Sequence, residues 1–431
     1  MGASRSSSRP AVSGERADLA TRALLLLCPA TFFQGYDELV LGLSLPLIAA
    51  DMGLTTSRAG FAVSAIQAGS FGLLVLLPLA DRVGRRPMLL WTIVGYTVAT
   101  VATAASNGVA ELIAFQFVAR ALLGTEYALA TIAVVDLVPA SRRGRALGLL
   151  TSMSAFGMAT AGAAFLAVES LGLSWRVLFA VGAVPLAVVA IARRRLPETL
   201  PGRGMPGRAT APDPSRPARG RLGDLRVALA DAGVRPRTVA AAATLSLLSS
   251  VYPTALTAFA TLLVLREWGI RVTTLHPAQL ALWVGGVSGF FVAGRLADRV
   301  GRRPAAVAFL GLAALAGLIG VPADGTWTRT VGLGLVIFGL TGSTPLVSAL
   351  TAEPFPPALR GRVAAVTRTA GLVGATIAPG LTGALSALTG SLASGLSLVA
   401  LAEGLAVPVV LLLPEARAAG RPAHRDEEPG R

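Results

Sequence analysis

Three ionisable side chains interrupt long apolar runs in the first half of the sequence: Asp37, Arg120 and Glu126. A charge at the centre of an apolar helix is costly, so each is treated as a functional residue. Burial favours the neutral form of a carboxyl group, and Asp37 could therefore take up and release a proton. Arg120 could hold a substrate carboxylate through paired hydrogen bonds or neutralise Asp37 or Glu126. These residue types predict a site for a proton and a small anionic solute.

Polar and aromatic neighbours extend this candidate site. Gln34 and Tyr36 precede Asp37 in the same apolar run, and Tyr127 follows Glu126 directly. We expect all three to line the cavity. Aromatic residues of membrane helices also pack or lie at the interface, so a structural role stays open for both tyrosines.

Each charged candidate also has a structural explanation. Asp37 could pair permanently with an arginine and only hold helices together. Arg120 could lie near a helix end, from which its guanidinium reaches water. In the second half, Arg368 could face the cavity or merely a neighbouring helix.

The composition indicates the elements that must position these residues. The 431 residues are 53% hydrophobic and 14% charged, against roughly 25% charged in soluble domains. Repeated apolar segments longer than about 18 residues are typical of an all-α polytopic membrane protein. Twelve transmembrane helices are expected, at 22–49, 57–80, 88–106, 109–137, 146–170, 174–194, 237–265, 277–297, 305–321, 328–352, 363–388 and 391–413.

A long polar stretch rich in proline and arginine divides the twelve segments into two groups of six. The expected organisation is a disordered cytoplasmic tail (1–20), an N-terminal six-helix bundle (21–194), a cytoplasmic linker (195–235), a C-terminal six-helix bundle (236–413) and a second cytoplasmic tail (414–431).

The formal charge of +15 comes from 38 basic residues, all arginine, which concentrate in alternate loops and in both tails. By the positive-inside rule this pattern predicts a multi-pass protein of the plasma (inner) membrane with both termini in the cytoplasm, and it argues against nucleic-acid binding. A lipid bilayer and a small-molecule solute are the expected partners, and the chain is expected to act as a monomer.

The sequence lacks the residues that several classes of protein function require. One cysteine and two distant histidines offer neither a disulfide framework nor a metal site. Without lysine there is no phosphate-binding loop for ATP-driven transport. No catalytic triad is found, so an enzyme is not expected, and no cofactor is expected beyond a proton as coupling ion.

An internal repeat organises the chain. The nine residues Leu79–Pro87 return unchanged 217 positions later as Leu296–Pro304, and two further blocks keep the same offset. We therefore interpret the two groups of six helices as homologous halves. Within the repeat, Asp81 and Asp298 end helices at the cytoplasmic face, where a carboxylate could meet the positive N-terminal end of a neighbouring helix.

The constant offset also predicts ion pairs. Arg85 and Arg302 occupy equivalent positions in the two turns, and Asp136 maps onto Glu353. We expect the pairs Arg85–Asp136 and Arg302–Glu353 to act as a cytoplasmic gate that breaks when the bundles rock. The alternative is a pair of static anchors at the membrane surface.

These motifs resemble the major facilitator superfamily of secondary transporters over nearly the whole chain. Gly72–Arg86 is similar to the family's signature between the second and third helices, and Asp298–Arg303 repeats it. The resemblance implies the family's twelve-helix fold, alternating access and a solute site near mid-membrane.

Within the superfamily the chain is most similar to the metabolite and aromatic-acid proton symporters. Four blocks carry this likeness: Phe32–Asp37, Arg120–Tyr127, Trp175–Arg176 and Leu196–Thr199. Gln34, Thr125 and Ala128 depart from the branch pattern. The resemblance implies proton-coupled symport of an organic acid or related metabolite. The alternative is proton-antiport export of a drug-like or secondary metabolite, although Ala155–Ala159 lacks the Gly-Pro element of the family's antiporters.

Overall fold

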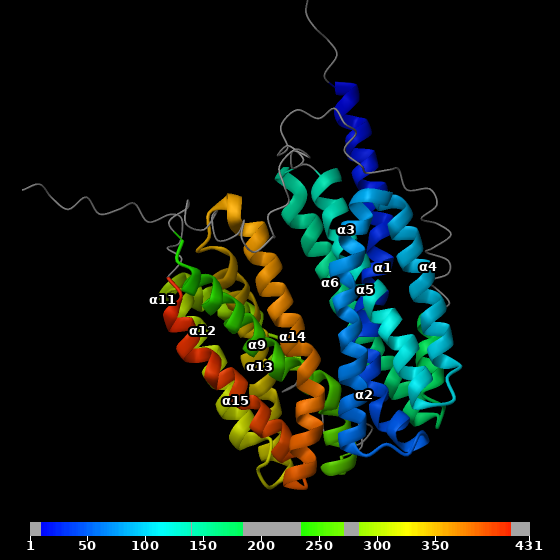
Figure 1. Ribbon diagram of the computed structural model, residues 1–431, viewed down its shortest axis with the longest axis vertical. Helices are drawn as coiled ribbons and strands as arrows, with labels where there is room; N and C mark the ends of the chain where they lie inside the picture. Colours follow the sequence, from blue (N-terminus) through cyan, green and yellow to red (C-terminus); the bar gives the residue numbers. More distant parts are fainter. Residues whose placement is uncertain (1–9, 139, 184–233, 271–283, 415–431) are drawn as a thin grey trace, which may run out of the picture. The chain divides into compact units, whose positions relative to one another are not determined.

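The computed structural model describes residues 10–138, 140–183, 234–270 and 284–414. Within these ranges the regular structure is helical, without a β-strand (Figure 1). Helices satisfy their own backbone hydrogen bonds, which is what a chain crossing hydrocarbon requires.

The first half contributes α1 (Pro10–Asp51), α2 (Thr56–Ala68), α3 (Leu73–Val83), α4 (Arg85–Ala104), α5 (Val109–Leu137) and α6 (Ala140–Ser170), with a 3₁₀ turn at Gly69–Gly72. The second half contributes α9 (Pro236–Leu262), α11 (Gly289–Val300), α12 (Arg302–Leu315), α13 (Thr326–Ala352), α14 (Pro357–Thr389) and α15 (Leu392–Leu412). Two π-helical turns extend α9 and α12, at Leu263–Glu267 and Ala316–Gly320.

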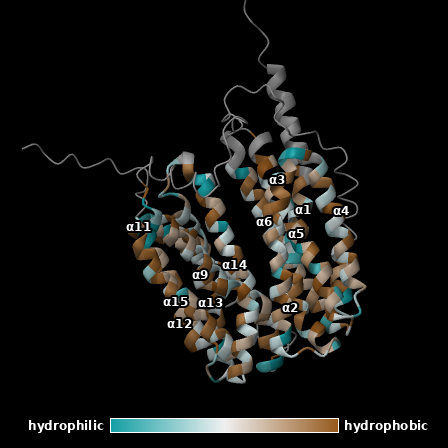
Figure 2. Ribbon diagram, in the orientation of Figure 1, coloured by the Kyte–Doolittle hydropathy of each residue, from teal (hydrophilic) through white to brown (hydrophobic). Residues whose placement is uncertain are grey.

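Nine helices in the described ranges are long and apolar enough to cross a membrane. Figure 2 shows hydrophobic residues along most of their length. The expected span 109–137 coincides with α5, whereas 57–80 corresponds to α2, the 3₁₀ turn and α3 together. Parts of the expected spans 174–194 and 277–297 lie outside the described residues. The same holds for residues 1–9, for most of the linker 195–235 and for the tail after residue 414.

The N-terminal tail differs from its expectation. Residues 10–20 are helical and belong to α1. Pro10 suits the first turn of a helix, where its missing N–H costs nothing. The residues after Gly14 include alanine, leucine, arginine and glutamate, which are strong helix formers. The helix α1 therefore begins well before its apolar segment.

The helices form two compact units. The first comprises Met1–Pro214 with Leu256–Thr274 and Pro379–Ala384, and the second comprises Ser215–Ala255, Leu275–Ala378 and Leu385–Arg431. In the first unit the backbones of α1 and α6 approach each other closely at two glycines. A Cβ atom on Gly35 would lie 1.9 Å from the Ser154 carbonyl oxygen, and one on Gly157 would lie 1.8 Å from that of Phe32. Such close approach is how membrane helices associate tightly.

The repeated turn has the same backbone conformation in both halves. Gly84 separates α3 from α4 with φ of 111°, and Gly301 separates α11 from α12 with φ of 99°. These positive φ values are costly for any residue with a Cβ atom. The repeat therefore preserves glycine where the chain must turn sharply between two helices.

Candidate functional site

Asp37 lies inside the first unit, on α1, with only 3% of its surface exposed. The Tyr96 hydroxyl on α4 and the Arg120 guanidinium on α5 lie close enough to its carboxylate to interact with it. The second carboxylate oxygen, Oδ2, has no hydrogen-bond partner among the described residues. The carboxylate is thus partly neutralised and keeps one free hydrogen-bonding position.

Arg120 is buried as well, with 8% of its surface exposed. The alternative in which its guanidinium reaches water from a helix end does not hold in this structure, because the side chain is buried and within range of the Asp37 charge. Its Nε atom has no hydrogen-bond partner in the described part of the chain. A buried guanidinium with an open donor can receive an anionic ligand.

Glu126, on α5, is buried in the same unit. The Thr92 hydroxyl on α4 donates to its Oε2 atom over 2.5 Å. The same hydroxyl also lies 2.9 Å from the Met88 carbonyl oxygen of its own helix. Glu126 is therefore held against α4. It lies six residues, or about 1.7 turns, along α5 from Arg120, so the two charges do not share one turn.

Gln34 and Tyr127 join Glu126 around one small hollow between α1 and α5. It is lined by Ala30, Thr31, Gln34, Glu126, Tyr127 and Ala130, and it is too narrow for a water molecule. Gln34 Nε2 also donates to Glu38 over 2.9 Å. These residues come together as expected, but a solute would have to widen the hollow.

Tyr36 takes a different position from the one expected. It is buried, and its hydroxyl donates to the Leu178 carbonyl oxygen over 2.9 Å. Gly182 packs on its ring, since a Cβ there would lie 3.1 Å from Cε1. Tyr36 therefore ties α1 to the helix that follows Trp175, and this contact supports the packing alternative.

Sequence reasoning missed Tyr96 and Thr92. Both lie on α4 in a buried polar row with Thr100 and Thr103, spaced three to four residues apart. This spacing puts them on one helix face. A polar row at helical spacing in an apolar segment was the signal that could have found them.

The second unit contains one of the two predicted gate pairs. Arg302 at the start of α12 forms an ion pair with Glu353, the residue directly after α13. The side chains of Arg85 and Asp136 lie outside the described residues. Asp81 and Asp298 are exposed in the last turns of α3 and α11. The gating role of these residues stays a prediction.

Arg368 belongs to the second unit and is exposed on α14. Asp37, Arg120 and Glu126 belong to the first unit. The role of Arg368 in solute binding stays a prediction as well.

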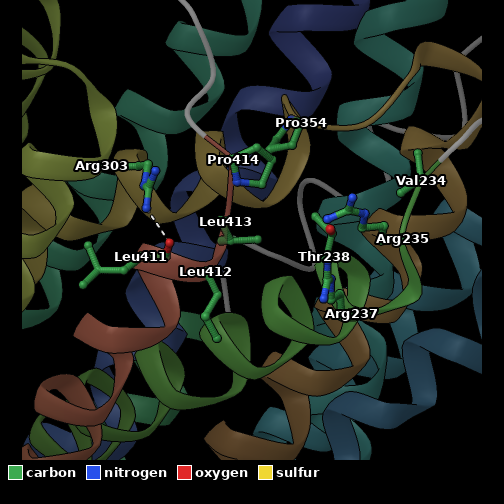
Figure 3. A pocket seen from close by; sticks show the side chains of 10 residues that line it. All are labelled: Val234, Arg235, Arg237, Thr238, Arg303, Pro354, Leu411, Leu412, Leu413 and Pro414. Atoms are coloured by element: carbon green, nitrogen blue, oxygen red, sulfur yellow. Dashed lines mark hydrogen bonds between the residues drawn. The ribbon is translucent and has the colours of Figure 1, made fainter.

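A larger pocket, of about 700 Å³, opens at the end of the second unit where α9 begins and α15 ends (Figure 3). It is lined by Val234, Arg235, Arg237, Thr238, Arg303, Pro354, Leu411, Leu412, Leu413 and Pro414. Arg303 donates a hydrogen bond to the Leu411 carbonyl oxygen (Figure 3). None of the predicted solute-binding residues lines this pocket, so it is not the candidate solute site.

Comparison with known proteins identifies the family. A family model described as Major Facilitator Superfamily matches residues 27–342 and 238–430. The chain belongs to this superfamily. The prediction of a transporter rather than an enzyme is thereby confirmed.

Curated relatives align over parts of the chain. "Myo-inositol transporter 3C" of Cryptococcus neoformans is 34% identical over 200 residues, which are 44% of this chain and 33% of that protein. The chain thus spans about a third of the length of the inositol transporters it matches. The niacin transporter of Acinetobacter baylyi is 29% identical over 39% of this chain and 38% of its own. A putative metabolite transport protein of Haemophilus influenzae is 26% identical over 76% of this chain and 79% of its own.

Solved structures confirm the fold. A D-xylose-proton symporter has a TM-score of 0.71 at 16% identity, covering 92% of this chain and 98% of its own. A bacterial homologue of the lysosomal transporter Spinster has a TM-score of 0.67 at 16% identity, covering 94% and 96%. At these identities the likeness concerns the fold alone.

Proposed function

We propose that this protein carries a small organic acid or related metabolite across the plasma membrane together with a proton, with both termini in the cytoplasm. The main support is that Asp37 and Arg120 are both buried, lie close enough for their charges to interact, and each keep an atom, Asp37 Oδ2 and Arg120 Nε, without a partner among the described residues. A buried charge pair that keeps open hydrogen-bonding positions suits ligand binding better than it suits a purely structural role.

The proposed coupling follows from the chemistry of this pair. While Asp37 is ionised, it competes with any other anion for the Arg120 guanidinium. Protonation removes that competition and leaves Arg120 free to bind a solute carboxylate through paired hydrogen bonds. Proton and anionic solute would then occupy the site together, and alternating access of the two bundles would release both on the other side.

Relatives name the solutes to test first. The matched proteins include transporters of myo-inositol, niacin, sialic acid and gallate. Three of these solutes are acids, and myo-inositol is a neutral polyol. The panel therefore separates recognition of a carboxylate from recognition of hydroxyl groups.

The first prediction concerns Asp37→Asn in proteoliposomes that carry an inward proton gradient. Accumulation of the accepted solute should fall at least about tenfold, because the amide neither binds a transferable proton nor pairs with Arg120. Counterflow of labelled solute without a gradient should persist. The matched control is Glu38→Gln, which changes the adjacent, exposed carboxylate of the same helix.

Two outcomes would contradict the proposal. Gradient-driven accumulation that survives in Asp37→Asn would remove Asp37 from coupling. Extrusion of the solute against an inward proton gradient would support the exporter alternative instead.

A further inference from the structure

Glu403 is a buried carboxyl group that the proposed mechanism does not use. It lies on α15 in the second unit, with 0% of its surface exposed. It is the one charged residue in the sequence of that helix. Neither carboxylate oxygen has a hydrogen-bond partner within the described ranges. An ionised carboxylate in such a place would lose its hydration and gain nothing in return.

The elements that pack against α15 surround Glu403 mainly with apolar side chains. α12 and the π-helical turn Ala316–Gly320 lie against it, and their buried residues include Phe309, Leu310 and Ala314. The charged residues of these two elements are Arg302 and Arg303, and both lie at the start of α12. Arg303 contacts the carbonyl of Leu411, eight residues and therefore about 12 Å along α15 from Glu403.

One polar group does face Glu403, the hydroxyl of Tyr252 on α9. Tyr252 is fully buried, and its hydroxyl oxygen has no hydrogen-bond partner in the described part of the protein. It is close enough to Glu403 for a charge on the carboxylate to act on it. Two buried polar groups, both unpartnered, thus lie near each other in the same unit.

Helix geometry explains this juxtaposition. A Cβ atom on Gly317 would lie 2.6 Å from both the Ala400 Cβ and the Tyr252 hydroxyl oxygen. Ala400 and Glu403 are three residues apart and share a face of α15. Because helical side chains lean toward the N-terminus, the Glu403 carboxyl lies over the turn that contains Ala400. Gly317 leaves the space in which the phenol and the carboxyl can meet.

From this geometry we propose that Glu403 is a proton-binding residue inside the C-terminal bundle, with the Tyr252 hydroxyl as its hydrogen-bonding partner. The bound species is a hydrogen ion, held as the carboxylic acid O–H. This acid has one donor and further acceptor capacity, which the phenol can match with a small side-chain rotation. The neighbouring π-helical turn is a deformable element of a kind frequent at functional sites. The proposal does not depend on Asp37 or on the identity of the solute.

Infrared spectroscopy of the purified full-length protein in lipid tests the proposal. Protonated carboxylic acids have a carbonyl stretch that ionised carboxylates lack. We expect a protonated carboxyl band at neutral pH that shifts when glutamate is ¹³C-labelled and that is lost in Glu403→Gln. Asp37→Asn should leave this band unchanged. In Tyr252→Phe the band should move to higher frequency, because the carboxyl loses its hydrogen-bonding partner.

The outcomes are decisive in both directions. Isotope labelling and Tyr252→Phe keep Glu403 itself in place, so the test does not depend on how well Glu403→Gln folds. A neutral-pH spectrum without a ¹³C-sensitive carboxylic acid band would show that Glu403 is ionised and would overturn the proposal. A ¹³C-sensitive band that persists in folded Glu403→Gln would assign the proton to another glutamate and would overturn it too.

Discussion

At the scale of single residues, the buried charges of the first unit are arranged differently from the exposed ones. Asp37 and Arg120 are buried within range of each other's charge, and each keeps an atom without a partner among the described residues. Asp51 at the end of α1 is exposed, and its Oδ2 accepts hydrogen bonds from Trp175 Nε1 over 3.0 Å and from Arg176 Nη1 over 2.8 Å. Asp37 and Arg120 can therefore bind and release a ligand, whereas the Asp51 contacts fix the end of α1.

Asp51 supports a prediction about pH. The hydrogen bond from Trp175, followed by that from Arg176, lowers the pKa of the Asp51 carboxyl below its ordinary value. A lowered pKa in the folded state stabilises the fold at pH values above the ordinary pKa of about 4, and this contribution is lost as pH falls through the folded value. Asp51→Asn should therefore lower the melting temperature at neutral pH. The melting temperature of this variant should also decline less than that of the wild type as the pH falls.

Asp324→Asn is the matched control for this measurement. Its carboxylate is fully exposed and lies 4.0 Å from Arg329. It should leave the pH dependence of the melting temperature unchanged. Identical acid profiles for Asp51→Asn and the wild type would show that the Asp51 contacts add no stability.

Some site residues could be predicted from the sequence because the free-energy cost of burying a charge depends on the apolar segment in which it stands. Asp37, Arg120 and Glu126 stand out since any charge in an apolar run needs a reason. Thr92 and Tyr96 do not stand out, because threonine in a helix commonly bonds to its own backbone, as Thr92 also does with Met88. Their partners lie on other helices, and only the tertiary packing shows which helix face turns inward.

At the scale of elements, transmembrane segments follow from hydropathy because transfer into lipid is a property of each segment by itself. The extension of α1 back to Pro10 did not follow, since it depends on helix propensity outside the apolar run. The Arg302–Glu353 contact could be anticipated because the internal repeat relates Arg302 to Arg85 and Glu353 to Asp136.

The contact between α1 and α6 gives a prediction at this scale. Gly157→Ala should destabilise the first unit by about 1–3 kcal/mol, because the added Cβ forces two backbones apart. Gly162→Ala on the same helix meets nothing within 4 Å, and it should stabilise the helix by up to about 1 kcal/mol. Thermal unfolding in detergent measures both. Equal melting temperatures for the two variants would contradict the close packing.

At the scale of the whole molecule, the repeat predicts how conformation is controlled. Ala365 is exposed on α14, eight residues after the start of that helix at Pro357. In a Cys28→Ser background with a single cysteine at Ala365, Glu353→Gln should raise the rate of thiol labelling about two- to fivefold. That range corresponds to the worth of a partly exposed ion pair. The reason is that Arg302 would lose its ion-pair partner Glu353, which in the predicted gate keeps the cytoplasmic side closed.

The charge-swapped variant Arg302→Glu/Glu353→Arg is the control, since it restores the attraction with the signs reversed. Labelling at the wild-type rate should return in it. A labelling rate that does not change in Glu353→Gln would make the pair a static anchor.

The glycine contact between α1 and α6 has a mechanical consequence. At Gly35 and Gly157 backbone rests on backbone, so at these two points no side chain separates the helices that could bend or repack. The two helices therefore resist sliding past each other there. Asp37 lies two residues from Gly35, so we expect a displacement of α1 that begins at this carboxyl to move α6 with it.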